Sequence, residues 1–344
     1  MKTLQIFLFS VVLSAAFASQ ARDWEKITIP GAVCGNGEPY SVFVGRAGST
    51  GLVVEFMGGG ACWSETTCYG SSPLTKLTPM EGPPPESMIT TQGPGNPWTN
   101  HTAIFFPYCT GDVFAGLHVA YYKQGVPLYH SGYSNVLATL QYLQSRNIVN
   151  FAGFNDVTVW GFSAGAIGAL MHADTVEGYL SRSARKTLIA DSPGLHFGNT
   201  FWRKFPDAMN RDFASTFARV GLTYSLDDGL LAPRMGPVFT HYSGWTIGIL
   251  QSTKDMVMSM IFGNISPEAH RALVLGPQGI GAVAAAYPNV KTWIAETMMH
   301  TFLKQSSSAS FKDMRGETAW NFVVRVHDPS KERRSPLAVE HVQP

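Results

Sequence analysis

The chain has 344 residues, of which 45% are hydrophobic and 14% are charged, and its formal net charge is +1. This length and hydrophobic content allow a large buried core. The balance of acidic and basic residues excludes nucleic acid as a partner and provides no polybasic patch for a membrane surface.

The first 21 residues, MKTLQIFLFSVVLSAAFASQA, place Lys2 before an apolar run that ends in small residues. This order is typical of a secretion signal, with cleavage after Ala18 or Ala21. The apolar run is shorter than the ~20 residues that a membrane span requires, and no later segment is long and apolar enough. We therefore predict a signal peptide over residues 1–21 and a secreted or periplasmic mature chain without an integral membrane segment.

Short β-type runs alternate with helical or irregular stretches along the remaining chain. Residues 131–148 carry apolar side chains at helical spacing and lie before the β-type run Val157 to Trp160. This alternation predicts an α/β fold of one domain over residues 22–326, with a mostly parallel, α/β-hydrolase-like sheet and helices on both faces. Residues 327–344 lack periodicity and are predicted to be a loose tail. The runs are Tyr40 to Val44, Leu52 to Phe56, Thr102 to Phe106, Val157 to Trp160, Thr187 to Ala190 and Ile247 to Leu250.

The four cysteines, Cys34, Cys62, Cys68 and Cys109, fall in the first third of the chain. An even number of cysteines in an exported protein favours disulfides over metal ligation. Of the three possible pairings, the spacing CWSETTC favours a local Cys62–Cys68 bridge, which leaves Cys34 to pair with Cys109. No cysteine or histidine cluster has the spacing of zinc ligands, so no metal is predicted.

Three consecutive glycines, Gly58 to Gly60, follow the apolar run that ends at Phe56. They are compatible with a simple flexible turn. They are also compatible with an oxyanion hole, because backbone N–H groups aimed at a developing negative charge need a chain free of side-chain crowding.

The pentapeptide Gly-Phe-Ser-Ala-Gly around Ser163 lies between a β-type run and an Ala/Gly/Leu stretch without proline. A strand, a sharp turn and a helix are the context that a hydrolase nucleophile requires. An ordinary strand–turn–helix connection is the alternative. We interpret Ser163 as the nucleophile.

The acid and the base of such a site follow the serine in the order Asp or Glu, then His. Asp255 follows the second β-type run after Ser163 and is the preferred acid, whereas Asp191 follows the first run and is the alternative. Among the histidines after Asp255, His300 follows an apolar run that predicts the final strand. His327, after the strand-like FVVRV, is the reserve.

The segments FMGGGACWSETTC, FFPYCTGDVFAG and WGFSAGAIGAL follow an early VCGNGEPYSVFVG in this order. In this combination the chain resembles the pectin acetylesterase and Notum family of secreted carboxylesterases, from about Val33 to Trp320. The resemblance implies oxyanion donors at the backbone N–H groups of Gly59, Gly60 and Ala164, and it supports Asp255 and His300. Family members tend to carry an aromatic residue at or just after Gly60, where this chain has only small residues.

The predicted function is that of a secreted serine esterase that removes acetyl groups from a polysaccharide such as pectin. A Notum-like deacylase of longer chains on protein or lipid is the alternative, and a non-catalytic binding protein on the same scaffold is a third hypothesis. The triad chemistry requires no cofactor. Acyl-chain length, acceptor alcohol, oligomeric state and the use of the sequons at Asn100 and Asn264 are left open by the sequence.

Overall fold

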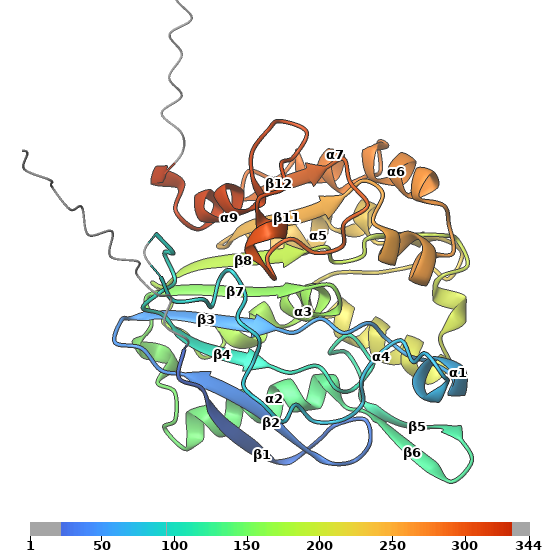
Figure 1. The fold of residues 1–344 in the computed structure, drawn as a ribbon, viewed down its shortest axis with the longest axis horizontal. Coiled ribbons are helices and arrows are strands. Elements are labelled where there is room, and N and C mark those ends of the chain that lie inside the picture. The colour runs from blue at the N-terminus through green and yellow to red at the C-terminus, as the bar shows by residue number, and fades with distance from the viewer. Residues whose placement is uncertain (1–21, 94, 332–344) are drawn as a thin grey trace, which may run out of the picture.

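A single eight-stranded sheet organises the chain in the computed structural model, which describes residues 22–93 and 95–331. The predicted signal peptide and residues 332–344 of the predicted tail lie outside the described residues. The strand order is β1-β2-β4-β3-β7-β8-β11-β12 (Figure 1). β1 and β2 are antiparallel to their neighbours, and β4, β3, β7, β8, β11 and β12 are parallel to one another. The predicted α/β fold with a mostly parallel sheet is confirmed.

The strands of this sheet are largely runs of β-branched and aromatic residues, which suit a pleated, buried surface. Their bounds are β1 Glu25–Val33, β2 Pro39–Gly45, β3 Gly51–Phe56, β4 Thr102–Phe106, β7 Asp156–Phe162, β8 Arg185–Asp191, β11 Thr246–Ser252 and β12 Val290–Ala295. Two further pairs lie outside it: β5 His118–Lys123 with β6 Val126–His130, and β9 His196–Phe197 with β10 Gly229–Leu230. The hairpin of β5 and β6 projects beyond the parallel strands (Figure 1).

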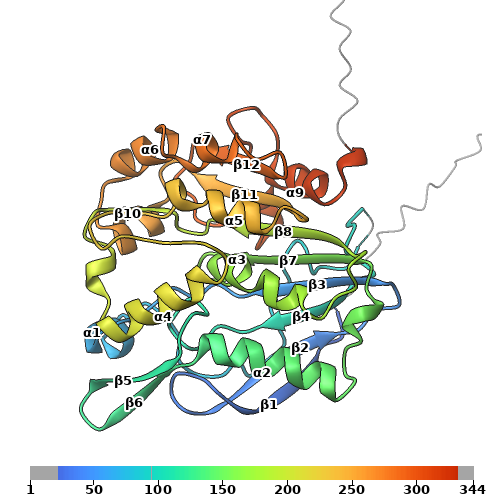
Figure 2. The ribbon, with the colours of Figure 1, turned by 180° about the vertical axis from the view of Figure 1, so that it is seen from behind.

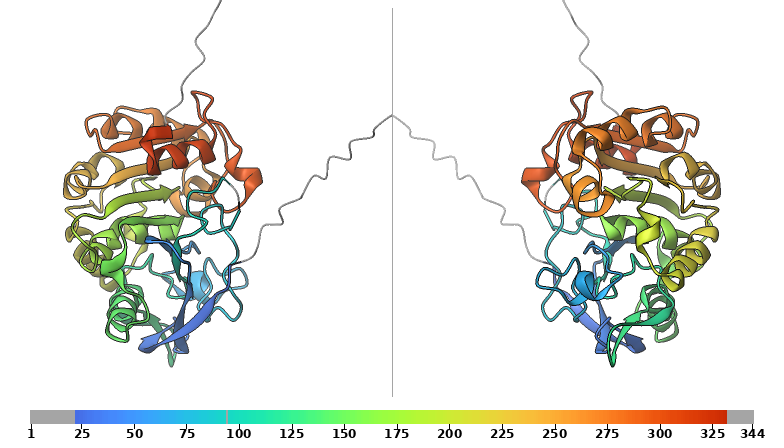
Figure 3. Two further views of the ribbon diagram at one scale, coloured as in Figure 1. Left: turned by 90° about the vertical axis from the view of Figure 1, so that its left-hand side faces the viewer. Right: turned by 90° about the vertical axis from the view of Figure 1, so that its right-hand side faces the viewer.

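Helices cover both faces of the sheet, as the side views show (Figure 3). α2 and α3 cross one face (Figure 2), and α9 packs on the other face against β8, β11 and β12. None of the helices in the described part of the chain combines the length and the apolarity needed to cross a bilayer. The helices are α1 Glu65–Tyr69, α2 Gly132–Ser145, α3 Ala164–Glu177, α4 Asp207–Ala218, α5 Gly236–His241, α6 Pro267–Leu275, α7 Ile280–Ala284, α8 Ser306–Ala309 and α9 Ala319–His327, with a π-helix, η4, at Val257–Gly263.

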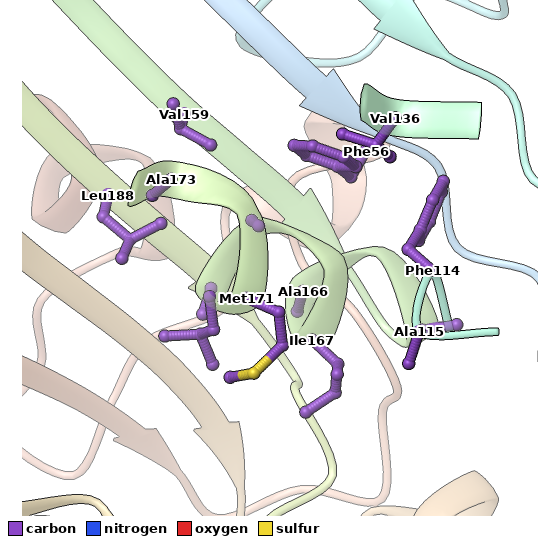
Figure 4. Close-up of a cluster of buried hydrophobic side chains, with 14 of the residues drawn as sticks. Phe56, Phe114, Ala115, Val136, Val159, Ala166, Ile167, Met171, Ala173 and Leu188 are labelled. Carbon is purple, nitrogen blue, oxygen red and sulfur yellow. The ribbon is translucent and has the colours of Figure 1, made fainter. Parts of the chain in front are cut away.

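The core beneath α3 holds the start of this helix in place. Phe56 from β3, Val159 from β7 and Leu188 from β8 pack along α3 (Figure 4). Every residue from Ala164 to Ala173 is buried. Burial of apolar surface stabilises a fold by about 25 cal/mol per Å², so these buried residues stabilise the junction of β7 and α3.

The C-terminal segment differs from the sequence-based expectation. The valine-rich FVVRV predicts a strand by local propensity, but it lies inside α9. Phe322, Val323 and Val326 form one apolar face that packs on the sheet, and the Thr318 hydroxyl caps the helix by accepting a hydrogen bond from Asn321 N. His327 is the buried last residue of α9, so the tail begins after it rather than at residue 327.

Candidate active site

Ser163 occupies a sharp turn between β7, which ends at Phe162, and α3, which begins at Ala164. Its φ is 56°, a left-handed value that is costly for a residue with a Cβ and typical of a nucleophile turn. Close packing explains both glycines of the pentapeptide: a Cβ on Gly161 would lie 2.1 Å from the carbonyl oxygen of Gly165. The local sequence therefore produces the strand–turn–helix geometry that was predicted for it.

Asp255 and His300 form a hydrogen-bonded pair. His300 Nδ1 lies 2.7 Å from Asp255 Oδ2, and the carboxylate is fully buried. The other carboxylate oxygen, Oδ1, accepts hydrogen bonds from Val257 N and Met258 N, both at 3.0 Å. With both oxygens engaged, the carboxylate has a fixed orientation, and the Nδ1–H tautomer of His300 is the one that satisfies it.

The second ring nitrogen of His300, Nε2, is buried and has no hydrogen-bond partner among the described residues. A neutral imidazole that donates from Nδ1 has an acceptor lone pair at Nε2. Ser163 and His300 line the same surface depression, which we call the open cleft. Its lining residues are Gly58, Gly59, Gly60, Pro73, Leu74, Phe162, Ser163, Val257, Ile261, Phe262, His300, Thr301 and Lys304.

The glycine loop after β3 forms one wall of the open cleft. Gly60 has φ 80°, and a Cβ there would lie 2.0 Å from the carbonyl oxygen of Leu74, so only glycine fits. The Tyr108 hydroxyl donates to Gly60 O at 2.9 Å and thereby fixes this peptide. Within the described chain, the N–H groups of Gly59 and Gly60 donate to no backbone carbonyl. They are available to an oxygen in the cleft.

Two disulfides tie this wall to the rest of the fold. Cys62 pairs with Cys68 and Cys34 pairs with Cys109, the same pairs that the spacing predicted. The first closes a loop directly after the glycines, and the second joins the end of β1 to the segment after β4. Both restrict the chain that carries the candidate oxyanion donors.

A second depression, the apolar pocket, adjoins the open cleft and shares Gly60, Ser163 and Phe262 with it. Its lining includes Ser163 and Ala164, and the rest of its wall consists of glycine, proline, aliphatic, methionine and aromatic residues. Seven aromatic rings dominate this wall: Phe197, Phe201, Trp202, Phe205, Phe213, Phe217 and Phe262. Ser163 thus lines both an open cleft that contains His300 and an apolar pocket.

Asp191, the alternative acid, lies at the end of β8 and is fully buried. Its Oδ2 accepts hydrogen bonds from Phe302 N at 2.7 Å and Leu303 N at 2.9 Å. Burial raises the pKa of Asp191 to about 6, against the opposing effect of these donors and of His300. The carboxylate therefore contacts the backbone after His300, whereas the imidazole is bonded to Asp255.

The reserve base, His327, lies at the opposite end of β7 from Ser163. There His101, Asp156 and His327 have side-chain atoms within 4.8 Å of one another, a separation that a metal ion could bridge. Arg185 Nη2 already lies 2.6 Å from Asp156 Oδ2 and 3.4 Å from His327 Nε2. The guanidinium supplies the positive charge of this cluster, which we interpret as an ion-pair network that anchors α9.

Sequence reasoning missed the apolar pocket and Lys304 of the open cleft. The only local signal for the pocket was the density of aromatic residues between Phe197 and Phe217. That signal does not tell a packed core from a pocket, because the other walls come from segments that are remote in sequence. Lys304 lies in an irregular segment without any pattern.

The comparisons with known proteins bear on this geometry. The family model described as pectinacetylesterase matches residues 22–225, which is more than half of the chain. The match includes the glycine loop and Ser163 and ends before Asp255 and His300. A comparison with curated proteins finds no match. The chain belongs to the pectinacetylesterase family and is a hydrolase of the acetylesterase type.

Proposed function

We propose that this protein is a secreted serine carboxylesterase that hydrolyses acetyl esters on a polysaccharide such as pectin. The observation that carries the proposal is the 2.7 Å Asp255–His300 pair: His300 lines the same cleft as Ser163, and its Nε2 has no hydrogen-bond partner among the described residues. A serine nucleophile, a histidine base and an aspartate that orients the histidine are the catalytic groups of a serine hydrolase, and Ser163, His300 and Asp255 would hold these roles.

In the proposed mechanism, His300 Nε2 takes the proton from Ser163 Oγ as that oxygen attacks the ester carbonyl. The resulting oxyanion accepts hydrogen bonds from the N–H groups of Gly59, Gly60 and Ala164. Ala164 N is at the start of α3, where the helix dipole also favours negative charge. His300 then gives its proton to the leaving alcohol, and water repeats the sequence on the acyl-enzyme to release the acid.

Export is part of the proposal. It is supported by the signal-like residues 1–21 and by the two disulfides, which persist in oxidising compartments. The direct test of the whole proposal is release of acetate from acetylated pectin by the purified mature chain. Lack of hydrolysis of every acetyl ester tried would contradict it.

Lys304 supports a uronic acid polymer as the substrate. It is exposed at the open cleft, where it is the only lysine, arginine or carboxylate among the lining residues that the structure describes. Such a cation attracts the carboxylates of a polyuronide. We expect Lys304→Met to raise KM for acetylated pectin a few-fold, since an exposed charge pair contributes about 0.2–1 kcal/mol.

Hydrolysis of triacetin, which has no charge, should be unaffected by Lys304→Met. Added salt should reduce the difference between variant and unaltered chain on pectin. Lys123→Met, on the exposed hairpin of β5 and β6, is the matched control and should change neither substrate. An equal loss on pectin and triacetin would argue against a role of Lys304 in charge recognition.

The apolar pocket favours a second candidate function, the hydrolysis of acyl groups longer than acetyl. An acetyl group needs little space beyond the reacting carbonyl, whereas the pocket beside Ser163 adds a cavity of about 60 Å³ lined by seven aromatic rings, which suits a few further methylenes. Each methylene that a longer chain buries there contributes about 0.8 kcal/mol, or roughly a fourfold gain in kcat/KM. A series of nitrophenyl esters from acetyl to dodecanoyl distinguishes the two candidates by where kcat/KM is highest.

Ala61→Phe tests whether the apolar pocket binds the acyl chain. Ala61 is buried in the pocket wall, so a phenyl ring there takes up space that a chain would occupy. We expect kcat/KM for the octanoyl ester to fall about tenfold, which corresponds to the loss of roughly two buried methylenes. The kcat/KM for the acetyl ester should be unchanged. Ala214→Phe, on the exposed side of α4, is the control. A parallel loss on both esters would show that the pocket does not select the chain.

A further inference from the structure

Three residues with left-handed backbone lie next to one another around the candidate site. Ser163 has φ 56°, Ser192 has φ 58° and Thr301 has φ 68°, and all three carry a Cβ. Such conformations are costly and persist only where surrounding interactions hold them. The three residues belong to separate segments: the nucleophile turn, the end of β8 and the loop that carries His300.

Asp191 and Ser192 connect these segments through hydrogen bonds. Ser163 N donates to the main-chain oxygen of Asp191 at 2.8 Å, which extends the pairing of β7 with β8 into the nucleophile turn. On the other side, Asp191 Oδ2 accepts from the amides of residues 302 and 303. Ser192 Oγ accepts from Thr301 N at 3.2 Å. One strand end is therefore bonded to both the serine turn and the histidine loop.

We propose that Asp191 is a positioning residue of the candidate site, which sets His300 relative to Ser163 by holding the loop after His300 against the nucleophile turn. This inference rests on the proposed function, because it concerns the geometry of that triad. It is distinct from the role of the acid: the imidazole Nδ1 is bonded to Asp255. Asp191 acts on His300 through the backbone that follows it.

The need for such a residue follows from the topology. Ser163 follows β7, whereas His300 comes after β12, which is three strands away in the sheet order. β8 and β11 lie between β7 and β12. Of these two strands, β8 pairs with β7, and Asp191 is its last residue. A proton transfer requires the two reacting atoms to lie within hydrogen-bond distance, and a displacement of about 1 Å can cost about 10²-fold in rate.

The experiment measures the rate at which a fluorophosphonate, a reagent that reacts with activated serines, modifies Ser163, together with kcat and KM on an acetyl ester. Asp191→Ala removes the acceptor of two buried N–H groups. We expect labelling and kcat to fall about 10²-fold, with little change in KM because the walls of the cleft remain. Asp191→Asn keeps an oxygen that can accept from both amides and should restore most of the rate.

Asp313→Ala is the matched control. Asp313 is a buried carboxylate whose Oδ1 accepts from Arg315 N and Glu317 N, both at 2.9 Å, in a loop that carries no candidate residue. A merely structural role of Asp191 predicts that the two alanine variants lose Tm alike and keep kcat alike. The positioning role predicts that only Asp191→Ala loses kcat and labelling rate.

The outcomes separate this inference from the proposed function. If the unaltered chain is not labelled at Ser163, both fail. If it is labelled, and Asp191→Ala reacts at the same rate as the unaltered chain, the positioning role alone is overturned. Should Asp191→Ala not fold, Ser192→Ala removes the hydroxyl that accepts from Thr301 N and donates to Asp191 Oδ1 at 3.1 Å, and it should slow labelling several-fold. An unchanged rate in that variant would also overturn the inference.

Discussion

Ser163→Ala is expected to lose about 10⁶-fold in kcat on an acetyl ester, because removal of a triad serine costs about this factor in other serine hydrolases. The oxyanion donors remain and leave a residual rate of about 10³–10⁴ over water. The variant should fold normally, since the side chain of Ser163 makes no capping hydrogen bond to α3 and alanine adopts the same backbone at similar cost. Steady-state hydrolysis and thermal melting measure both effects.

The control for this substitution is Ser134→Ala on α2, where the hydroxyl is exposed and bonds only to the preceding turn. It should keep full activity. Turnover of Ser163→Ala near that of the unaltered chain would remove Ser163 from the mechanism and leave the family assignment without its nucleophile in this chain.

Asp255→Asn is expected to lose about 10⁴-fold in kcat, the effect of the corresponding change in other triads. The physical reason lies in the two N–H donors on Oδ1, Val257 N and Met258 N. An asparagine keeps its carbonyl oxygen toward these donors and so turns its NH₂ group toward His300 Nδ1. The imidazole must then accept at Nδ1 and carry its proton on Nε2, where it can no longer act as the base.

Asp191→Asn is the comparison variant that tests which of the two carboxylates is the acid. Both carboxylates are fully buried, but Asp191 bonds to backbone amides after His300 rather than to the ring. Measured side by side, Asp255→Asn should lose kcat with little change in Tm, whereas Asp191→Asn should keep most of its kcat. The opposite pattern would move the acid one strand earlier, to Asp191.

The part of the fold that supports Ser163 could be predicted from the sequence because its signals are local. Apolar β-branched runs predicted β3, β4, β7 and β8, and the pentapeptide with its flanks predicted the turn into α3. Asp255 and His300 were selected by chain order and family resemblance, and their roles remain predictions. Their hydrogen bond is a geometric finding that the order rule alone did not contain.

The parts that could not be predicted depend on contacts between distant segments. β1 contains Pro30 and Gly31 at a register shift in its pairing with β2, so its sequence lacks a regular strand pattern. The valines of α9 favour a strand by local propensity, and packing of one helical face on the sheet outweighs this preference. The apolar pocket unites residues from Gly60 to Phe262, and no short stretch predicts such an assembly.

The complete burial of the first ten residues of α3 limits how members of this fold can diverge or be re-engineered. A larger side chain anywhere from Ala164 to Ala173 would overpack the core and cost about 1–3 kcal/mol, so this helix offers little freedom for altering selectivity. Sequence variation is better tolerated in the connecting loops that run over the surface of the protein. Libraries aimed at new ester substrates therefore belong at wall residues after β3, β8 and β11 that carry no candidate catalytic, oxyanion or positioning group, such as Leu74, Phe197 and Ile261.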